Sequence, residues 1–391
     1  MANGIDRRQF TKGAVTLGAA AGLNLASPMI AAARQPYTGP NVIIVRFGGG
    51  VRRRETIEPE TSYSPFLAHE LTRRGTLFNN MTISSQEGVV TSHAQGTLYI
   101  LTGRYDRYSD VEDRFLSERF EPKSPTLFEY LRKSFAIPDH QALIVNGEDR
   151  VSEDFLNFSE NHNYGIEYRS SVLSLHWYKT WLLREKLKGD IDDEARTELA
   201  KQLAEREARN YRGELAGDQG DAMEGFWRRW RRYYGDSGFL NPRGDRLLTE
   251  LSIRAIHELR PRLMMINYQD PDYVHWGNLS HYTRAISIID NGLQQLVATV
   301  ENDPEYRDNT VFVIVPDCGR DDNPLMDIAC QHHFNSRSAH EIWALVFGAG
   351  IARNAIVDKP VDQISLAATI GRVMGMKTDV SEGPPLAEVF A

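Results

Sequence analysis

Short apolar runs rich in β-branched residues, separated by segments with helical spacing, are the feature that most constrains the fold of this chain. Between two of these runs, residues 282–300 carry Ile, Leu and Val every three or four positions, which predicts a helix with one apolar stripe. Apolar strands that alternate with helices predict an α/β fold: an open, mostly parallel sheet with helices on both faces. The expected strands are 41–47, 142–145, 263–268, 310–315 and 343–347.

Length, composition and charge narrow the class of protein. The chain has 391 residues, of which 41% are hydrophobic and 25% are charged, as in an ordinary soluble globular protein with a large core. Its formal net charge of −8 argues against general binding to nucleic acid or to anionic membranes.

The N-terminus has the three parts of a signal peptide. Arg7, Arg8 and Lys12 precede an apolar stretch over 13–30, and three alanines at 31–33 offer a cleavage site. The paired arginines resemble the twin-arginine export signal. We therefore expect residues 1–33 to be removed, leaving a periplasmic or secreted protein of residues 34–391 that is not bound to a membrane. The alternative is a membrane anchor, because the stretch is nearly long enough to span a bilayer.

The middle of the chain differs in character from the rest. Residues 152–261 are highly charged and predict a helical insertion that caps a site on the sheet. Within it, residues 226–234 mix aromatic and basic side chains. This run either stacks on an anionic ligand or forms an amphipathic helix with Trp in the core and Arg outward, and we favour the helix.

Acidic and imidazole side chains follow the later strands. Ligand sites in open α/β sheets lie beyond the carboxyl ends of the strands, so these side chains predict a metal site there. Imidazole ligands favour zinc among the divalent metals. The candidate ligands are Asp272, His275, Asp317, Cys318, His332 and His333.

The order of these motifs resembles that of the alkaline phosphatase superfamily, which includes phosphatases, sulfatases, nucleotide pyrophosphatases and phosphomutases. The motifs are Leu101-Thr102-Gly103-Arg104, Asp272…His275-Trp276-Gly277, Asp317-Cys318-Gly319-Arg320 and a late His before a strand, and the resemblance covers about 41–102 and 263–350. It implies that Asp272, His275 and the late His (His333, or its neighbour His332) hold one metal ion. Three such ligands leave a fourth position for water or a substrate oxygen.

The chain departs from the superfamily pattern at the second metal site. The superfamily places an Asp at the end of the first strand, where this chain has Phe47-Gly48-Gly49-Gly50, and it has Asp-His-Gly where this chain has Asp317-Cys318-Gly319. A Cys thiolate can bind zinc, but Cys318 cannot do so if it is bonded to Cys330. We therefore expect a degenerate second site.

The superfamily nucleophile is a Ser, Thr or modified Cys at a helix N-terminus, nine residues before the Thr of the Thr-Gly pair. In this chain that position is His93, next to Thr91 and Ser92. A helix N-terminus favours an anionic substrate. The resemblance leaves two readings: Thr91 or Ser92 is the nucleophile, or His93 itself faces the metal.

The glycines after the first strand precede Arg52 and Arg53. Backbone N–H groups and guanidinium groups suit a phosphate or sulfate, so this loop is a candidate anion site; the alternative is a tight turn followed by a solvated basic face. Together the motifs predict a metal-dependent hydrolase of anionic small-molecule phosphate or sulfate esters. The alternative is a non-catalytic superfamily member that binds a ligand or partner.

Overall fold

The computed structural model describes residues 34–106, 121–147, 151–208, 220–235, 244–275, 278–322, 331–332 and 336–390. The chain divides into two units, Met1–Ala33 and Arg34–Ala391, and the first, with the predicted signal peptide, lies outside the described residues. Trp276, Gly277, Cys330 and His333 also lie outside them. No helix in the described part of the chain is long and apolar enough to cross a membrane.

Within the residues that the structure describes, nine strands form one sheet in the order β4-β3-β5-β1-β6-β7-β2-β8, with β9 paired to β2. The pairs from β4 to β6 are parallel, whereas β7 runs antiparallel to both β6 and β2. The predicted α/β class is therefore confirmed, and each of the five expected strands is present. The strands are β1 (Asn41–Phe47), β2 (Gly75–Thr82), β3 (Ala142–Asn146), β4 (Ser171–Ser174), β5 (Leu263–Asn267), β6 (Thr310–Pro316), β7 (Glu341–Gly348), β8 (Ala355–Val357) and β9 (Val361–Asp362).

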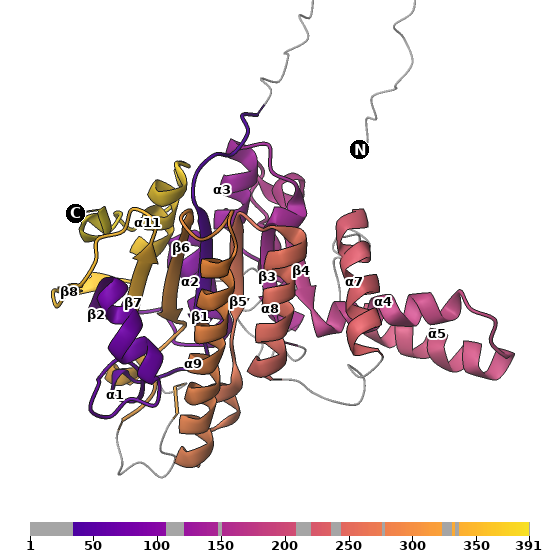
Figure 1. Ribbon diagram of the computed structural model, residues 1–391, viewed down its shortest axis with the longest axis horizontal. Coiled ribbons are helices and arrows are strands. Elements are labelled where there is room, and N and C mark those ends of the chain that lie inside the picture. Colours follow the sequence, from indigo (N-terminus) through magenta and orange to yellow (C-terminus); the bar gives the residue numbers. More distant parts are fainter. Residues whose placement is uncertain are drawn as a thin grey trace, which may run out of the picture. The chain divides into compact units, whose positions relative to one another are not determined.

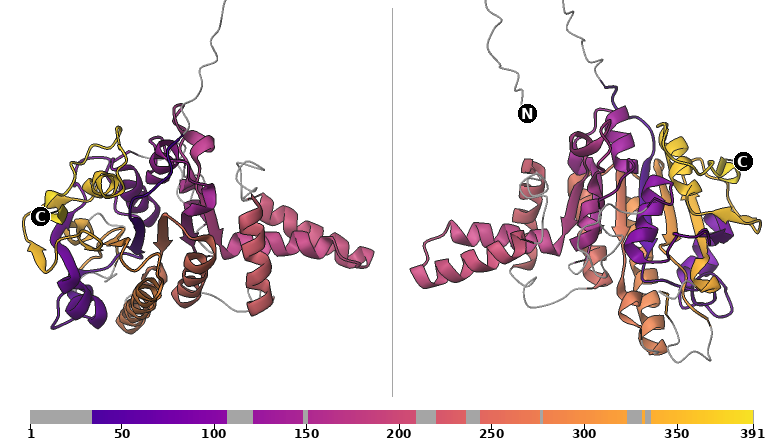
Figure 2. Two further views of the ribbon diagram at one scale, coloured as in Figure 1. Left: turned by 45° about the horizontal axis from the view of Figure 1, so that its top comes forward. Right: turned by 180° about the vertical axis from the view of Figure 1, so that it is seen from behind.

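Helices cover both faces of the sheet, because alternate side chains of the central strands point into two separate cores. In β1, Ile43 and Val45 belong to one buried cluster, and Val42 and Ile44 belong to the other. Figure 1 shows α8 (Asp245–Leu259) and α9 (Leu279–Asn302) over the first face. The helices over the other face, seen from behind in Figure 2, are α2 (His93–Thr102), α3 (Leu127–Ser134) and α11 (Ser365–Met374).

Helix α9 shows why the sequence pattern was informative. The apolar stripe expected over 282–300 is buried, with Ile286, Ile289 and Leu293 fully inaccessible to solvent. The helix begins after Asn278, whose side chain accepts a hydrogen bond from the backbone N–H of His281. The predicted helix is thus confirmed and extends slightly further at each end.

The segment 152–261, which we predicted as a helical insertion, also contributes to the sheet. It provides the edge strand β4 and the covering helix α8, while α4 (Leu175–Leu187), α5 (Asp193–Glu207) and α7 (Gly220–Tyr234) lie beyond the β4 edge (Figure 1). In α7, Trp227 and Trp230 are buried, whereas the side chain of Arg228 is 62% exposed. The amphipathic interpretation of the aromatic-basic run is therefore confirmed.

The described residues also form several short elements. They are α1 (Arg53–Thr56), η1 (Phe66–Glu70), η2 (Leu71–Arg74), η3 (Asp139–Gln141), η4 (Val151–Asn157), η5 (Gly165–Tyr168), η7 (Asp270–Tyr273), α10 (Arg337–His340) and η8 (Ala387–Phe390).

Candidate metal centre

The candidate site lies where the parallel strands β1, β5 and β6 end at one edge of the sheet. The loop after β5 carries Asp272 and His275, and the residue that follows β6 is Asp317. The first residue of α2, His93, meets them from the helix N-terminus. The topology thus brings together side chains that are more than 200 residues apart in the sequence.

One oxygen of Asp272 is the centre of the cluster. Its Oδ1 lies 2.5 Å from His93 Nε2, 2.9 Å from His275 Nε2 and 3.1 Å from His332 Nε2. Burial opposes ionisation of this carboxyl, but His93 and the hydrogen bonds from the three imidazoles outweigh it and hold the pKa of Asp272 well below its ordinary value. Three imidazoles therefore converge on one carboxylate.

Asp317 orients the His93 ring from its other side. His93 Nδ1 lies 2.7 Å from Asp317 Oδ2, and the Asp317 side chain is fully buried. Burial disfavours the charged imidazole, but Asp272 and Asp317 outweigh that effect and raise the pKa of His93. In the neutral ring, an Nδ1–H donated to Asp317 leaves the lone pair of Nε2 facing the cluster.

His275 is oriented in a similar way by Gln331. Gln331 Oε1 lies 3.1 Å from His275 Nδ1, and its amide nitrogen donates to the His275 carbonyl. Because Nδ1 of His275 is held by an acceptor, Nε2 is left to face Asp272.

The loops that carry these groups are joined by Arg320, whose side chain is fully buried. Its guanidinium donates to carbonyls in the loop after β1, with Nε 2.7 Å from Gly50 O and Nη2 also bonded to Gly49 O. It also donates to the loop after β5, with 2.5 Å to Val274 O and 2.9 Å to Pro271 O. One arginine therefore satisfies four backbone carbonyls at the site edge.

The glycine loop after β1 binds a carboxylate of the protein itself, that of Asp317. The backbone N–H groups of Gly49 and Gly50 donate to Asp317 at 3.4 and 3.2 Å. Both glycines have positive φ, +94° and +65°, a conformation that other residues adopt at a cost. We predicted that these N–H groups could bind a phosphate or sulfate. In the structure they donate to the Asp317 carboxylate instead.

The predicted anion-binding arginines lie beside this loop. Arg52 makes a two-point ion pair with Glu55, at 2.7 and 2.6 Å. Arg53 donates to Ile342 O at 3.2 Å and to Asn80 Oδ1 at 3.3 Å. Both line a cavity of about 230 Å³ that also contains acidic side chains, so their role in binding an external anion stays a prediction.

The three predicted catalytic residues, the candidate nucleophiles Thr91 and Ser92 and the alternative His93, occupy three different environments. Thr91 is buried and its hydroxyl donates to His332 O at 2.9 Å. Ser92 caps α2 by position but makes no side-chain capping bond. His93 is the residue of the three whose ring enters the cluster.

Cys318 is a free, fully buried cysteine, while Cys330 lies outside the described residues. Burial, followed by the charge of Asp317, raises the pKa of the Cys318 thiol well above its ordinary value. It groups with His93 and His332, with one donor atom from each residue lying within 4.8 Å of the others.

The donor set Asp272, His275 and His332 fits a divalent ion of the zinc type. Its donor atoms also lie within 4.8 Å of one another. A tetrahedral zinc ion with bonds of about 2.0–2.1 Å separates its ligand atoms by about 3.3 Å. The Asp272–His275 and Asp272–His332 distances of 2.9 and 3.1 Å are close to that value. His332 supplies the late imidazole in this set.

Arg46 is the site residue that sequence reasoning missed. It lies within β1, is fully buried, and places Nη1 3.7 Å from Asp317 Oδ2. The available signal was a charged residue inside the otherwise apolar strand of residues 41–47.

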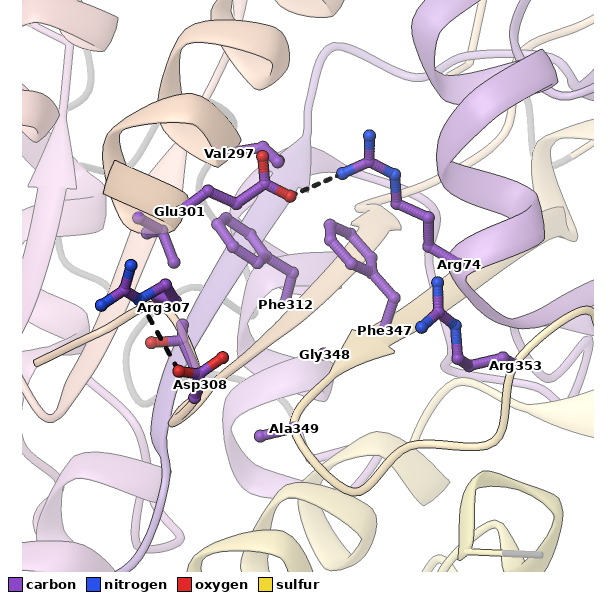
Figure 3. A pocket seen from close by; sticks show the side chains of 12 residues that line it. Arg74, Val297, Glu301, Arg307, Asp308, Phe312, Phe347, Gly348, Ala349 and Arg353 are labelled. Carbon is purple, nitrogen blue, oxygen red and sulfur yellow. Dashed lines mark hydrogen bonds and ion pairs between the residues drawn. The ribbon is translucent and has the colours of Figure 1, made fainter. Parts of the chain in front are cut away.

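A larger cavity, of about 570 Å³, lies at the opposite end of the central strands, where β6 begins (Figure 3). It is lined by the start of β6, including Thr310 and Phe312, and by Arg74, which pairs with Glu301 at 2.7 Å. Strand β6 leads from this cavity to Asp317, and seven residues of extended chain span about 23 Å. The cavity is therefore separate from the candidate metal centre.

Comparison with solved structures shows the fold, at low sequence identity. No protein-family model matches the sequence, and the search of curated proteins found no match. A protein in the alkaline phosphatase superfamily from Vibrio parahaemolyticus matches with a TM-score of 0.51 at 14% identity, over 91% of this chain and 72% of that chain. The lipoteichoic acid synthase LtaP from Listeria monocytogenes matches with a TM-score of 0.51 at 12% identity, over 90% and 76%. A putative sulfatase from Bacteroides thetaiotaomicron matches with a TM-score of 0.55 at 12% identity, over 90% and 75%.

Proposed function

Since the chain has the fold of the alkaline phosphatase superfamily, we propose that it is a metal-dependent hydrolase of phosphate or sulfate esters. The observation that carries the proposal is the convergence of His275 Nε2 and His332 Nε2 on Asp272 Oδ1 at the edge where the parallel strands end. These three side chains would hold one divalent ion, with zinc the best match to the imidazole donors. When bound, such an ion supplies Lewis-acid polarisation of an anionic ester.

His93 supplies the proton chemistry. Its Nε2 faces the cluster while Nδ1 is bonded to Asp317, the arrangement that a general base needs in order to be oriented and stabilised as it takes up a proton. Attack by water would transfer a proton to Nε2, and the alkoxide that leaves from the opposite side would take its proton from solvent. Asp317 fixes the tautomer throughout and stays ionised.

The names of the matched structures support an anionic ester as the substrate class. One matched protein is named a lipoteichoic acid synthase and another a putative sulfatase. The paired arginines and apolar stretch within residues 1–33 lead us to propose in addition that the protein is exported by the twin-arginine pathway to the periplasm or beyond.

The first test is metal content together with ester hydrolysis. We expect the purified protein to carry a tightly bound divalent ion and to hydrolyse at least one of p-nitrophenyl phosphate, bis-p-nitrophenyl phosphate and p-nitrophenyl sulfate. A His275→Ala/His332→Ala variant should lose both properties, as measured by elemental analysis and by release of p-nitrophenol. A folded, metal-bearing wild type that is inert toward all three esters would favour a non-catalytic ligand-binding protein.

The second test distinguishes the catalytic role of His93 from that of the neighbouring Ser92 hydroxyl. Loss of a general base typically costs 10²–10⁴ in rate, so His93→Gln should lower kcat by roughly that factor. Ser92→Ala, one residue away and outside the cluster, should stay within about tenfold of the wild type. The opposite ranking of the two variants in steady-state kinetics would make Ser92 the nucleophile.

A further inference from the structure

Arg46 is a charged side chain at a depth where charge is costly. It belongs to β1, and its side chain has no solvent exposure. Its Nη1 donates to Glu153 Oε2 and to Thr97 Oγ1, both at 2.8 Å, and its Nη2 donates to Tyr268 O at 3.2 Å. A buried guanidinium persists only when it is paired and hydrogen-bonded in this way. Because burying this charge is costly, we expect Arg46 to have a role beyond packing.

The guanidinium lies in the space next to Gly48, at the end of β1. A Cβ atom at Gly48 would stand 3.0 Å from Arg46 Nε and 3.0 Å from Nη2, and would overlap the carbonyl oxygen of Tyr268. No side chain, and hence no carboxylate, fits at position 48 without displacing these groups. The Tyr268 carbonyl, with the Arg46 guanidinium packed beside it, thus occupies the space into which a metal ligand at position 48 would project.

Arg46 also faces the carboxylate that would otherwise attract a second ion. Its Nη1 lies between Glu153 Oε2 at 2.8 Å and Asp317 Oδ2 at 3.7 Å. Asp317 already accepts four hydrogen bonds, from His93 Nδ1 and from the backbone N–H groups of Gly49, Gly50 and Cys318. A carboxylate offers about four lone-pair directions, so these donors, together with the charge of Arg46, satisfy Asp317 without a metal ion.

We propose that Arg46 is a built-in cation that takes the place of a second metal ion, so that the centre binds one divalent ion only, at Asp272, His275 and His332. Asp317 is then a positioning residue for His93, and Cys318 is a buried neutral side chain. The inference rests on the proposed metal site but not on ester hydrolysis. It explains why the chain combines an intact set of three ligands with a strand end that lacks a carboxylate.

A metal titration of the full chain tests this directly. We would strip the protein with a chelator, add Zn²⁺ or Co²⁺, and count bound ions by native mass spectrometry. Saturation at one ion per chain is expected, for the wild type and equally for Cys318→Ser. Two ions in the wild type, or loss of an ion in Cys318→Ser, would overturn the inference and leave the hydrolase proposal standing. Absence of any bound ion would overturn both.

Substitution of Arg46 tests its role as a cation. In Arg46→Met, the buried carboxylates of Glu153 and Asp317 face a vacated volume without a positive charge, so we expect a second divalent ion to bind at least tenfold more tightly than it does to Arg46→Lys, which keeps the charge. Equal binding of the second ion by the two variants would contradict the proposal. Near-UV circular dichroism checks that each variant is folded, and the wild-type titration alone decides the question if Arg46→Met is not.

Discussion

Asp154 shows what burial does to a single acid near the centre. Asn146 Nδ2 donates to its Oδ1 at 2.6 Å, and Ser174 Oγ donates to its Oδ2 at 3.3 Å. Burial, reinforced by the adjacent charge of Glu153, outweighs these bonds and raises the pKa of Asp154 to about 8. The carboxyl group therefore stays protonated in the folded protein at pH values where it ionises in the unfolded chain.

This raised pKa predicts a pH dependence of stability. Between about pH 4 and 8 the folded state holds a proton that the unfolded state releases, so this group makes the free energy of unfolding fall as pH rises, by up to about 1.4 kcal/mol per pH unit. Asp154→Asn mimics the neutral acid and should remove that contribution. In urea unfolding, the free energy of unfolding of the variant should rise relative to that of the wild type from pH 5 to pH 8. A difference between the two proteins that does not change with pH would contradict the expectation.

The individual site residues differed in how far the sequence revealed them. Asp272, His275 and Asp317 were visible because each follows an apolar run that was predicted as a strand. The contacts of Arg46 were not visible, because its partners Glu153 and Tyr268 are 107 and 222 residues away in the sequence. Pairing across the fold, rather than local pattern, decides where such a charge can be buried.

At the scale of elements, the site depends on the close approach of α2 to the end of β6. A Cβ atom at Gly96, one turn into α2, would overlap the carbonyl group of Asp317. The absence of a side chain therefore lets the helix bring His93 to Asp317. This approach is set by packing, so helical spacing alone does not reveal it.

Gly96→Ala should destabilise the protein although alanine is the better helix former. Overpacking typically costs 1–3 kcal/mol, and displacement of Asp317 should also weaken the orientation of His93. The matched control is Gly225→Ala in α7, where the nearest atom is the flexible end of Arg229 at 3.3 Å and alanine should add up to about 1 kcal/mol. Chemical denaturation measures the change in the free energy of unfolding for both variants. Equal changes would show that α2 can shift away from Asp317 without cost.

Strand prediction succeeded where both faces of a strand are apolar and failed where they are not. Strands β1, β5 and β6 are buried along their whole length. In β2 the polar Asn79 and Asn80 interrupt the pattern at an irregularity in the pairing with β7, and β4 has only four residues. Such strands are fixed by their neighbours in the sheet, which a single sequence does not show.

At the scale of the whole molecule, the centre joins segments that lie far apart in the sequence. Asp272 and His275 follow β5, His93 begins α2, and His332 lies in the segment before β7. An ion bound to ligands from separate segments stabilises the folded chain, because the unfolded chain does not hold those ligands together.

Removal of the metal should therefore lower the melting temperature. An ion at one hundred times its Kd adds about 2.7 kcal/mol to the free energy of unfolding, which corresponds to a Tm higher by a few degrees for a domain of this size. Differential scanning calorimetry with and without chelator should show this difference in the wild type and not in His275→Ala/His332→Ala. A chelator effect that persists in the variant would place the stabilising ion elsewhere.

The burial of Arg46 also has a consequence for the valence of the substrate. Arg46 supplies one positive charge where a second divalent ion would supply two, and Arg46 itself is enclosed and cannot reach a ligand. A centre with one ion attracts a doubly charged phosphate monoester less strongly than a centre with two ions would, since the attraction grows with the positive charge of the centre. We therefore expect singly charged esters, such as sulfate monoesters and phosphate diesters, to be turned over in preference to dianions.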